Sequence, residues 1–228
     1  MGLAYHAARI ETVALDINAF DFRLTPAYDH AYMPAVLSGI FRPCELMTNT
    51  FFTIGHSTRT IVEFNGLLKE SGVNFVVDVR SIPRSRTNPQ FNQQSLPKTL
   101  APWQIGYEHI AELGGLRGKV PGVVPSPNTY WQVRSFQNYA DYALTAPFAA
   151  GLALLRERGG QHRSAIMCAE AVWWRCHRRI ISDYLLAAGE QVMHILGKSH
   201  VDVASLTPGA VVRDDGTVVY PAEGRQPA

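Results

Sequence analysis

The chain has few of the features that would place it in a specialised class of proteins. Three cysteines in 228 residues, a small and odd number, argue against a disulfide framework, and no segment follows the pattern of a secretion signal. No apolar run approaches the roughly 20 residues that a membrane-spanning helix requires. Charged residues make up only 18%, too few for a disordered chain. These absences predict a globular cytoplasmic protein with reduced thiols and no membrane contact.

The chain is long enough to form one ordinary domain. Hydrophobic residues make up 46% of it, enough to bury a sizeable core without disulfides. Residues 1–46 have no sustained hydrophobic period and are predicted to be an N-terminal extension, with Met47 as an alternative start. The α/β domain is predicted to span residues 47–220, and residues 221–228 form a tail.

Positive charge is concentrated in the middle of the sequence. Residues 47–200 carry 16 Lys and Arg against 10 Asp and Glu, although the whole chain has a formal charge of only +2. An excess of this size suits an anionic ligand pocket as well as a nucleic-acid surface. It falls short of the basic stripe that is typical of a dedicated DNA binder.

Apolar strands alternate with helices from residue 51 onward. Strands are predicted at 51–54, 74–77, 106–109, 164–168 and 191–196, and helices at 60–71, 94–101, 136–144, 148–158 and 176–188. A capping box from Thr60 to Glu63 starts the first helix, while Gly72 ends it and Gly159-Gly160 ends the fourth. A linker at 202–208 leads to a C-terminal β-hairpin, 210–213 and 217–220. The pattern predicts a single α/β domain with a mostly parallel sheet and helices on both faces.

Polar residues follow the predicted strands at their carboxyl ends. They are His56 and Ser57 after the first strand, Asp78 and Arg80 after the second, His109 and Glu112 after the third, and Cys168 and Glu170 after the fourth. Ligands of open parallel sheets bind beyond these strand ends. We therefore expect the polar residues to gather at one edge of the sheet.

The segment 166–179 holds the densest set of reactive groups. Cys168 and Glu170 close its strand, and Cys176 and His177 open the next helix. Three arginines, Arg175, Arg178 and Arg179, lie among them. Packing alone does not require two thiols, a carboxylate, an imidazole and three guanidiniums so close together, so the segment predicts a functional site.

Several motifs together resemble a known family. They are TIGHS at 53–57, VDVRSIP at 77–83, NPQFN at 88–92, LGG at 113–115, YADY at 139–142, MCAE at 167–170 and CHR at 176–178. In this order they resemble the bacterial and archaeal "domain of unknown function 488" family over roughly residues 51–220. The resemblance implies a compact α/β domain and leaves the activity unassigned.

The leading hypothesis from the residues is acid/base chemistry on a phosphate-bearing substrate. Asp78 and Glu170, with His56 or His177 nearby, could act as general acid and base. The phosphate ligands would be Ser57, Arg80, Arg84, Arg175, Cys176 and Arg178, because guanidiniums and helix N-terminal amides suit phosphate. Trp174 could stack a base, which predicts a nucleotide or single-stranded nucleic acid as partner. The alternative is that these arginines form structural ion pairs.

Cysteine chemistry is a second hypothesis. Cys176 at a helix start, among arginines, would be stabilised as a thiolate, and Cys168 could join it as a nucleophile or redox partner. The spacing of a phosphatase loop fails, because Trp174 stands where arginine is needed and Arg175 comes one position late. The active loop of rhodanese-type sulfurtransferases is absent as well. A buried structural Cys168 is the alternative.

Metal binding and simple nucleic-acid binding complete the alternatives. Suitable ligands occur at Cys168, Cys176, His177, His56 and His109, but no Cys-x-x-Cys pair supports a metal site. No metal ligand or cofactor is therefore assigned, and a metal assembled from several strand ends stays an alternative. A nucleic-acid binder without catalysis would need basic residues spread along one face, whereas this chain concentrates thiols, carboxylates and imidazoles at one point.

Overall fold

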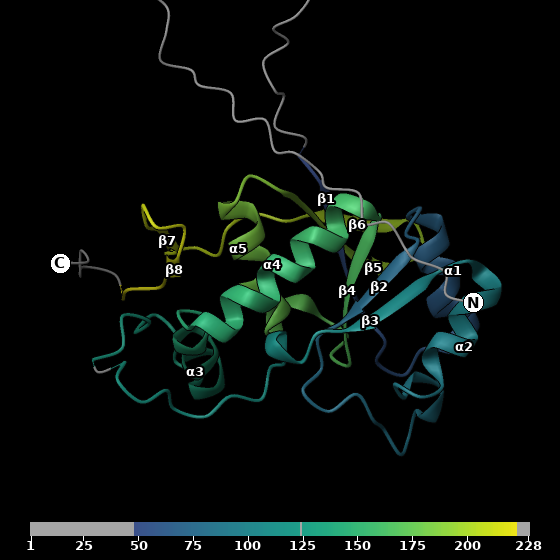
Figure 1. The fold of residues 1–228 in the computed structure, drawn as a ribbon, viewed down its shortest axis with the longest axis horizontal. Helices are drawn as coiled ribbons and strands as arrows, with labels where there is room; N and C mark the ends of the chain where they lie inside the picture. Colours follow the sequence, from purple (N-terminus) through teal and green to yellow (C-terminus); the bar gives the residue numbers. More distant parts are fainter. Residues whose placement is uncertain (1–47, 124, 223–228) are drawn as a thin grey trace, which may run out of the picture. The chain divides into compact units, whose positions relative to one another are not determined.

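A six-stranded sheet with the order β3-β2-β4-β1-β5-β6 forms the centre of the fold (Figure 1). The computed structural model describes residues 48–123 and 125–222, which belong to one compact unit. The strands are β1 Thr50–Gly55, β2 Phe75–Asp78, β3 Gly106–His109, β4 Ser164–Cys168, β5 Gln191–Gly197 and β6 His200–Val203. All neighbouring pairs are parallel except β5 and β6, which pair antiparallel. The predicted mostly parallel α/β sheet is thus confirmed.

Helices cover both faces of the sheet. They are α1 Ile61–Glu70, α2 Leu96–Leu100, α3 Arg134–Tyr142, α4 Ala146–Gln161 and α5 Arg178–Ala187, with short 3-10 turns η1 Pro89–Phe91, η2 Ala101–Trp103, η3 Ala111–Leu113 and η4 Trp173–Arg175. Figure 1 shows α1 and α2 together, away from α3 and α5. Side chains of α1 and α2 pack on Phe52 and Ile54, and those of α4 and α5 pack on Phe51 and Ile166. Alternate residues of β1 therefore face the two helical layers, because side-chain direction alternates along a strand.

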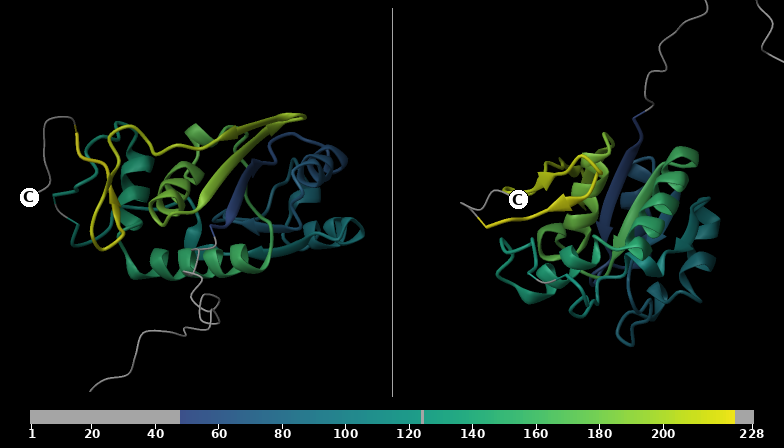
Figure 2. Two further views of the ribbon diagram at one scale, coloured as in Figure 1. Left: turned by 90° about the horizontal axis from the view of Figure 1, so that it is seen from above. Right: turned by 60° about the vertical axis from the view of Figure 1, so that its left-hand side comes forward.

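The predicted C-terminal hairpin is also present. It consists of β7 Val211–Val212 and β8 Val218–Val219, with Gly216 at φ 78° in the turn. Val218 and Val219 are buried, and the Tyr184 hydroxyl of α5 donates to the Val218 carbonyl at 3.3 Å. Figure 2 shows this C-terminal segment beside α5. The hairpin is thereby attached to the helical layer that carries α5.

Helix ends follow the sequence signals in part. Thr60 caps α1 and accepts from the Glu63 amide at 3.2 Å, as the capping box predicts, but the Glu63 carboxylate pairs with Arg59 at 3.4 Å. Gly72 and Gly189 have φ of 68° and 82° directly after α1 and α5, where glycine is needed. The predicted stop of α4 at Gly159-Gly160 is wrong, since α4 continues to Gln161.

Gly159 has a packing role inside α4 and does not end the helix. A Cβ at position 159 would collide with the Phe51 ring, so this glycine lets α4 approach β1 closely. The predicted linker at 202–208 is wrong at its start, because β6 runs to Val203. All four β6 residues are exposed, so no buried face marks this edge strand in the sequence. The predicted helix at 94–101 is shorter than expected and passes into η2.

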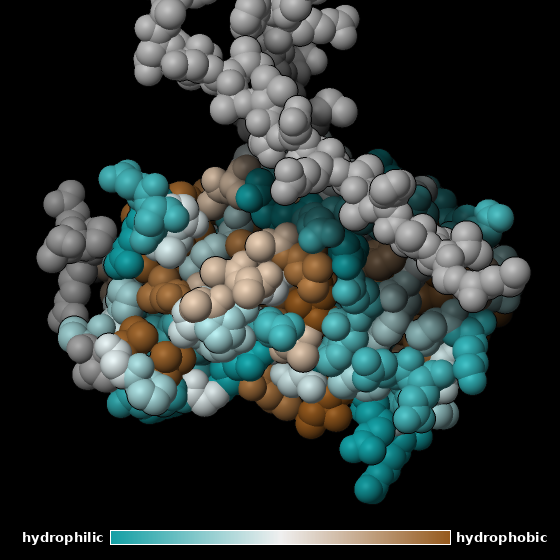
Figure 3. Space-filling model, in the orientation of Figure 1, coloured by the Kyte–Doolittle hydropathy of each residue, from teal (hydrophilic) through white to brown (hydrophobic). Residues whose placement is uncertain are grey.

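The predicted extension 1–46, Met47 as a start and residues 223–228 of the tail lie outside the described residues. Within the described part, no helix has the length and apolar character to cross a membrane. Figure 3 shows apolar side chains in separate patches among hydrophilic ones on the face it displays.

Candidate functional site

Three neighbouring strands, β2, β4 and β1, end at the same edge of the sheet. A cavity of about 330 Å³ lies at this edge. Its walls are formed by Arg80, Ser81, Ile82, Gly115, Leu116, Ser135, Phe136, Tyr139, Cys168, Ala169, Glu170, Arg175, Cys176 and His177. The lining comes from four separate segments, which the fold brings together beyond the strand ends as parallel sheets do.

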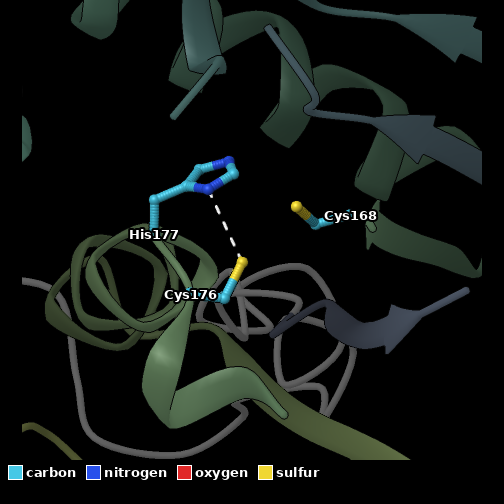
Figure 4. Close-up of side chains that lie close together, drawn as sticks. All are labelled: Cys168, Cys176 and His177. Carbon is cyan, nitrogen blue, oxygen red and sulfur yellow. Dashed lines mark hydrogen bonds between the residues drawn. The ribbon is translucent and has the colours of Figure 1, made fainter. Parts of the chain in front are cut away.

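Two thiols and an imidazole meet in this cavity. Cys168 is the last residue of β4, Cys176 follows η4, and His177 is the N-cap residue of α5. One sulfur or nitrogen atom of each residue lies within 4.8 Å of those of the other two. Figure 4 shows both sulfur atoms and the His177 ring directed toward one common space. We call these three residues the Cys-Cys-His cluster.

The orientation of His177 is determined by its outer nitrogen. Its Nε2 lies 2.9 Å from the Val79 carbonyl oxygen, which can only accept a hydrogen bond, so Nε2 carries a proton. In the neutral ring Nδ1 then has a free lone pair, and it lies 3.5 Å from the Cys176 sulfur. Gly115 lies against this ring, and any Cβ at position 115 would collide with Nδ1. The close approach explains why glycine occurs there.

Arg178 lies beneath the cluster as a buried cation. Its side chain is 1% exposed, and its Nε donates to the Cys176 sulfur at 3.3 Å. Its Nη2 donates to the Glu170 carbonyl at 2.5 Å. Among the described residues no carboxylate forms an ion pair with Arg178. A buried charge is stable only with a partner, and the Cys176 sulfur is the group in contact that can become anionic.

The two thiols differ in acidity. Burial raises the pKa of Cys176, but the hydrogen bond from Cys168 and the neighbouring His177 and Arg178 outweigh it, so that the pKa falls well below its usual value. The hydrogen bond to Cys176 raises the pKa of Cys168, and burial adds to the effect. The pair thus favours a thiolate at Cys176 beside a neutral thiol at Cys168.

Asp78 and Arg80 form a closed ion pair next to the cavity. Arg80 donates from Nε and Nη2 to the two carboxylate oxygens of Asp78 at 2.9 and 2.6 Å. Nη2 also donates to the Phe91 carbonyl at 2.6 Å, and the Tyr107 hydroxyl donates to Asp78 at 2.8 Å. Asp78 is fully buried, and both of its oxygens have donors. These contacts suit a structural task, and they give the predicted catalytic role of Asp78 no support.

His56 belongs to the same closed network. Its Nδ1 lies 3.0 Å from the Ser57 carbonyl oxygen, and its Nε2 lies 3.2 Å from Nη1 of Arg80. The ring stacks on Phe91 with a centroid distance of 4.3 Å. Burial lowers the pKa of His56 to about 4, so the ring is neutral at pH 7 and accepts from Arg80. His56 does not line the cavity.

The other predicted residues divide into two groups. Glu170 and Arg175 are exposed at the cavity, and neither forms an ion pair with any described residue. Ser57, Arg84 and Trp174 do not line it. Ser57 has φ 44° and donates its backbone N–H to the Ala169 carbonyl at 2.9 Å, which joins the loops after β1 and β4.

Several lining residues were not identified from the sequence as site residues. They are Ser81, Ile82, Gly115, Leu116, Ser135, Phe136 and Tyr139. Ser81 and Ile82 lie within the VDVRSIP motif, and Gly115 and Tyr139 lie within the LGG and YADY motifs, all of which the resemblance had marked without assigning these residues a role. Leu116, Ser135 and Phe136 lie outside those motifs, and their residue types do not indicate a site.

A second groove adjoins the cavity. Its volume is about 600 Å³, and it shares Ser135, Phe136 and Arg175 with the cavity. Its other lining residues are Tyr130, Trp131, Gln132, Val133, Trp174 and Arg179. Trp131 stacks on Phe136 at 4.9 Å between ring centroids, and the Arg179 guanidinium lies 4.9 Å above the Trp131 ring. We call this the aromatic groove.

The fold and the cluster define an α/β protein with a cysteine and histidine centre at the carboxyl ends of its strands. A family model described as "Domain of unknown function DUF488" matches residues 60–185, and the chain belongs to this family. The match includes β2, β3, β4 and nearly all of α5 with the whole cluster. Comparisons with curated proteins and with solved structures gave no match.

Proposed function

We propose that this protein is a cysteine-dependent enzyme whose reactive centre is the Cys-Cys-His cluster. The observation that carries the proposal is the convergence of Cys168, Cys176 and His177 at a cavity, above a buried Arg178 without a carboxylate partner. A buried guanidinium whose only ionisable partner is a thiol does not favour stability. A carboxylate partner, or an apolar side chain in place of the arginine, would cost less free energy. Strongly perturbed groups in a cavity are typical of catalytic sites.

Glu170 is the acid/base candidate in this proposal. Its carboxylate is exposed at the cavity and forms no ion pair with described residues, so it is free to exchange protons with a bound molecule. Asp78 shares the strand-end position, but its oxygens are occupied by Arg80 and Tyr107. The acid/base hypothesis is therefore kept for Glu170, with the cluster as the reactive centre beside it.

The proposed substrate bears a phosphate or a similar anionic group. Arg175 lies between the cavity and the aromatic groove and has no ion-pair partner among described residues. Guanidiniums without carboxylate partners suit phosphate, and exposed aromatic rings beside them suit a base. Trp174, 45% exposed, supports a nucleotide as the substrate. We place the reaction in the cytoplasm because Cys168 and Cys176 are free thiols, and thiols stay reduced in that compartment.

The test is a turnover screen of the full chain against nucleotides and simple phosphate esters. Cys176→Ser should abolish the activity found, and Glu170→Gln should lower it by about 10²–10⁴-fold, the range for a lost acid or base. Cys44→Ser is the matched control for cysteine replacement and should keep parental turnover. Full activity in Cys176→Ser would refute the proposal.

A further inference from the structure

The three members of the Cys-Cys-His cluster have the spacing of metal ligands. In a tetrahedral zinc site, bonds of about 2.3 Å to sulfur and about 2.0 Å to nitrogen place these two atoms about 3.5 Å apart. The Cys176 sulfur and His177 Nδ1 are 3.5 Å apart in the structure. No pair among the three ligand atoms exceeds 4.8 Å, so small side-chain rotations suffice to bring all three to one ion.

The surroundings of His177 fit a ligand as well. Metal-bound histidines almost always donate their second ring N–H to a carbonyl or carboxylate, which leaves the other nitrogen for the metal. His177 donates Nε2–H to the Val79 carbonyl at 2.9 Å, and its Nδ1 faces the two sulfurs. Arg178 donates to the Cys176 sulfur at 3.3 Å, an outer hydrogen bond of the kind that supports coordinating groups.

We propose that Cys168, Cys176 and His177 bind a single Zn²⁺ ion whose fourth coordination position opens into the cavity. Two sulfurs and one imidazole select zinc over magnesium or calcium, which prefer oxygen. Three protein ligands with an open fourth position are typical of catalytic rather than structural zinc. The proposal rests on the proposed function and deepens it, because it makes the cysteine dependence a dependence on metal.

The charges around the site are compatible with this ion. Two thiolates and a neutral imidazole balance its double charge, and Glu170 at the cavity adds a carboxylate that could accept a proton from a zinc-bound water. Arg178 lies behind the Cys176 sulfur and Arg175 at the cavity wall. Arg178 then keeps its hydrogen bond to the Cys176 sulfur, and Arg175 stays available to an anionic substrate.

The first test is metal content of the full chain, purified under reducing conditions without chelators. The parent should carry about one zinc per chain by mass spectrometry. Loss of an outer hydrogen-bond partner weakens metal binding by up to about 100-fold. Cys168→Ser, Cys176→Ser and His177→Ala each remove a direct ligand, so each should weaken Zn²⁺ binding by more than that. Ser135→Ala, a cavity residue, and His200→Ala, an exposed histidine, are matched controls and should bind as the parent does.

The second test is spectroscopic and does not depend on activity. Co²⁺ added to metal-free parent should give visible bands of a tetrahedral site and near-ultraviolet sulfur-to-cobalt absorption. Cys168→Ser and Cys176→Ser should each reduce the sulfur-to-cobalt absorption. His177→Ala should shift the visible bands and leave the sulfur-to-cobalt absorption in place. Circular dichroism and thermal unfolding of every variant show whether a loss of metal reflects a loss of fold.

The outcomes separate this inference from the proposed function. A reduced, folded parent that binds neither Zn²⁺ nor Co²⁺ overturns the metal site. A Cys168–Cys176 disulfide in the parent after anaerobic purification overturns it too, in favour of a redox pair. If the metal is absent while Cys176→Ser is inactive, the cysteine-dependent enzyme stands without zinc. If zinc binds and no cluster variant changes turnover in the screen, the site is a metal site and the proposed function fails.

Discussion

Two groups of reactive side chains lie at the same edge of the sheet, and they differ in how their polar atoms are used. In the network of Asp78, Arg80 and His56, every carboxylate oxygen and ring nitrogen has a protein partner within 3.2 Å. In the Cys-Cys-His cluster, the sulfurs and His177 Nδ1 face one another across a cavity at up to 4.8 Å. Both groups consist of reactive residues at the same edge of the sheet, so reactivity and position do not by themselves identify a site. A site is identified by polar atoms that remain available to a ligand.

The largest expected effect concerns the closed network. Asp78→Ala or Arg80→Ala leaves an uncompensated buried partner and should lower the free energy of unfolding by about 3–5 kcal/mol in denaturant titrations. The double variant Asp78→Leu with Arg80→Met should recover part of this loss, because no lone charge remains. Near-parental stability in Asp78→Ala combined with lost turnover would make Asp78 catalytic and break the comparison.

Gly115→Ala tests the packing behind the cluster. The added methyl group collides with the His177 ring, so we expect a loss of about 1–3 kcal/mol in unfolding free energy and displacement of the ring. Gly118→Ala is the matched control, since nothing lies within 4 Å of a Cβ there. Equal stability of the two variants would show that the cluster has room to adjust.

His194, the buried histidine of β5, should make the stability of the protein depend on pH. His194 is 1% exposed, its Nδ1 lies 2.8 Å from the Thr53 hydroxyl, and its ring stacks on Trp173 at 4.1 Å. Burial, with a smaller contribution from Arg178, lowers the pKa of His194 to about 4. Between pH 6.5 and 4 the histidine is therefore protonated in the unfolded chain but not in the folded one. Its contribution to the free energy of unfolding is fully present above pH 6.5 and is lost as the pH falls through this window.

The expected slope is up to about 1.4 kcal/mol per pH unit within that window. Denaturant titrations of the parent and of His194→Gln at pH 7 and pH 5 measure it. The variant lacks this titrating group and should lose less stability between the two pH values. Identical pH dependence of the two proteins would show that His194 is already protonated or that its burial is relieved by local opening.

The smallest stability effect is expected at Glu170. Because its carboxylate is exposed and forms no ion pair with described residues, Glu170→Gln should change the unfolding free energy by no more than about 0.5 kcal/mol. Its effect on turnover should be large, as proposed above. A stability loss comparable to that of Asp78→Ala would place Glu170 in the structural group and remove it from the acid/base role.

Much of the fold could be predicted from local patterns. The apolar run at 164–168 became β4 with the predicted bounds, because buried parallel strands are nearly continuous in hydrophobic residues. β3 also has its predicted bounds, 106–109, although its residues are only partly buried. The glycine signal at 72 was correct, because a positive φ is a local requirement. Gly159 misled the prediction, since its role is contact with Phe51, a residue more than a hundred positions away.

What the sequence by itself determined is the kind of fold and the segments that hold reactive residues, because hydrophobic periods, turn residues and residue types act locally. Tertiary structure alone decided which of those residues are available. The Asp78 carboxylate is occupied because Tyr107 and Arg80 donate hydrogen bonds to it. The Cys176 sulfur faces Cys168 and His177 because the fold brings the end of β4 close to the residues before α5. Pairing of side chains across distant segments depends on strand order and packing, and these are long-range properties that no local pattern records.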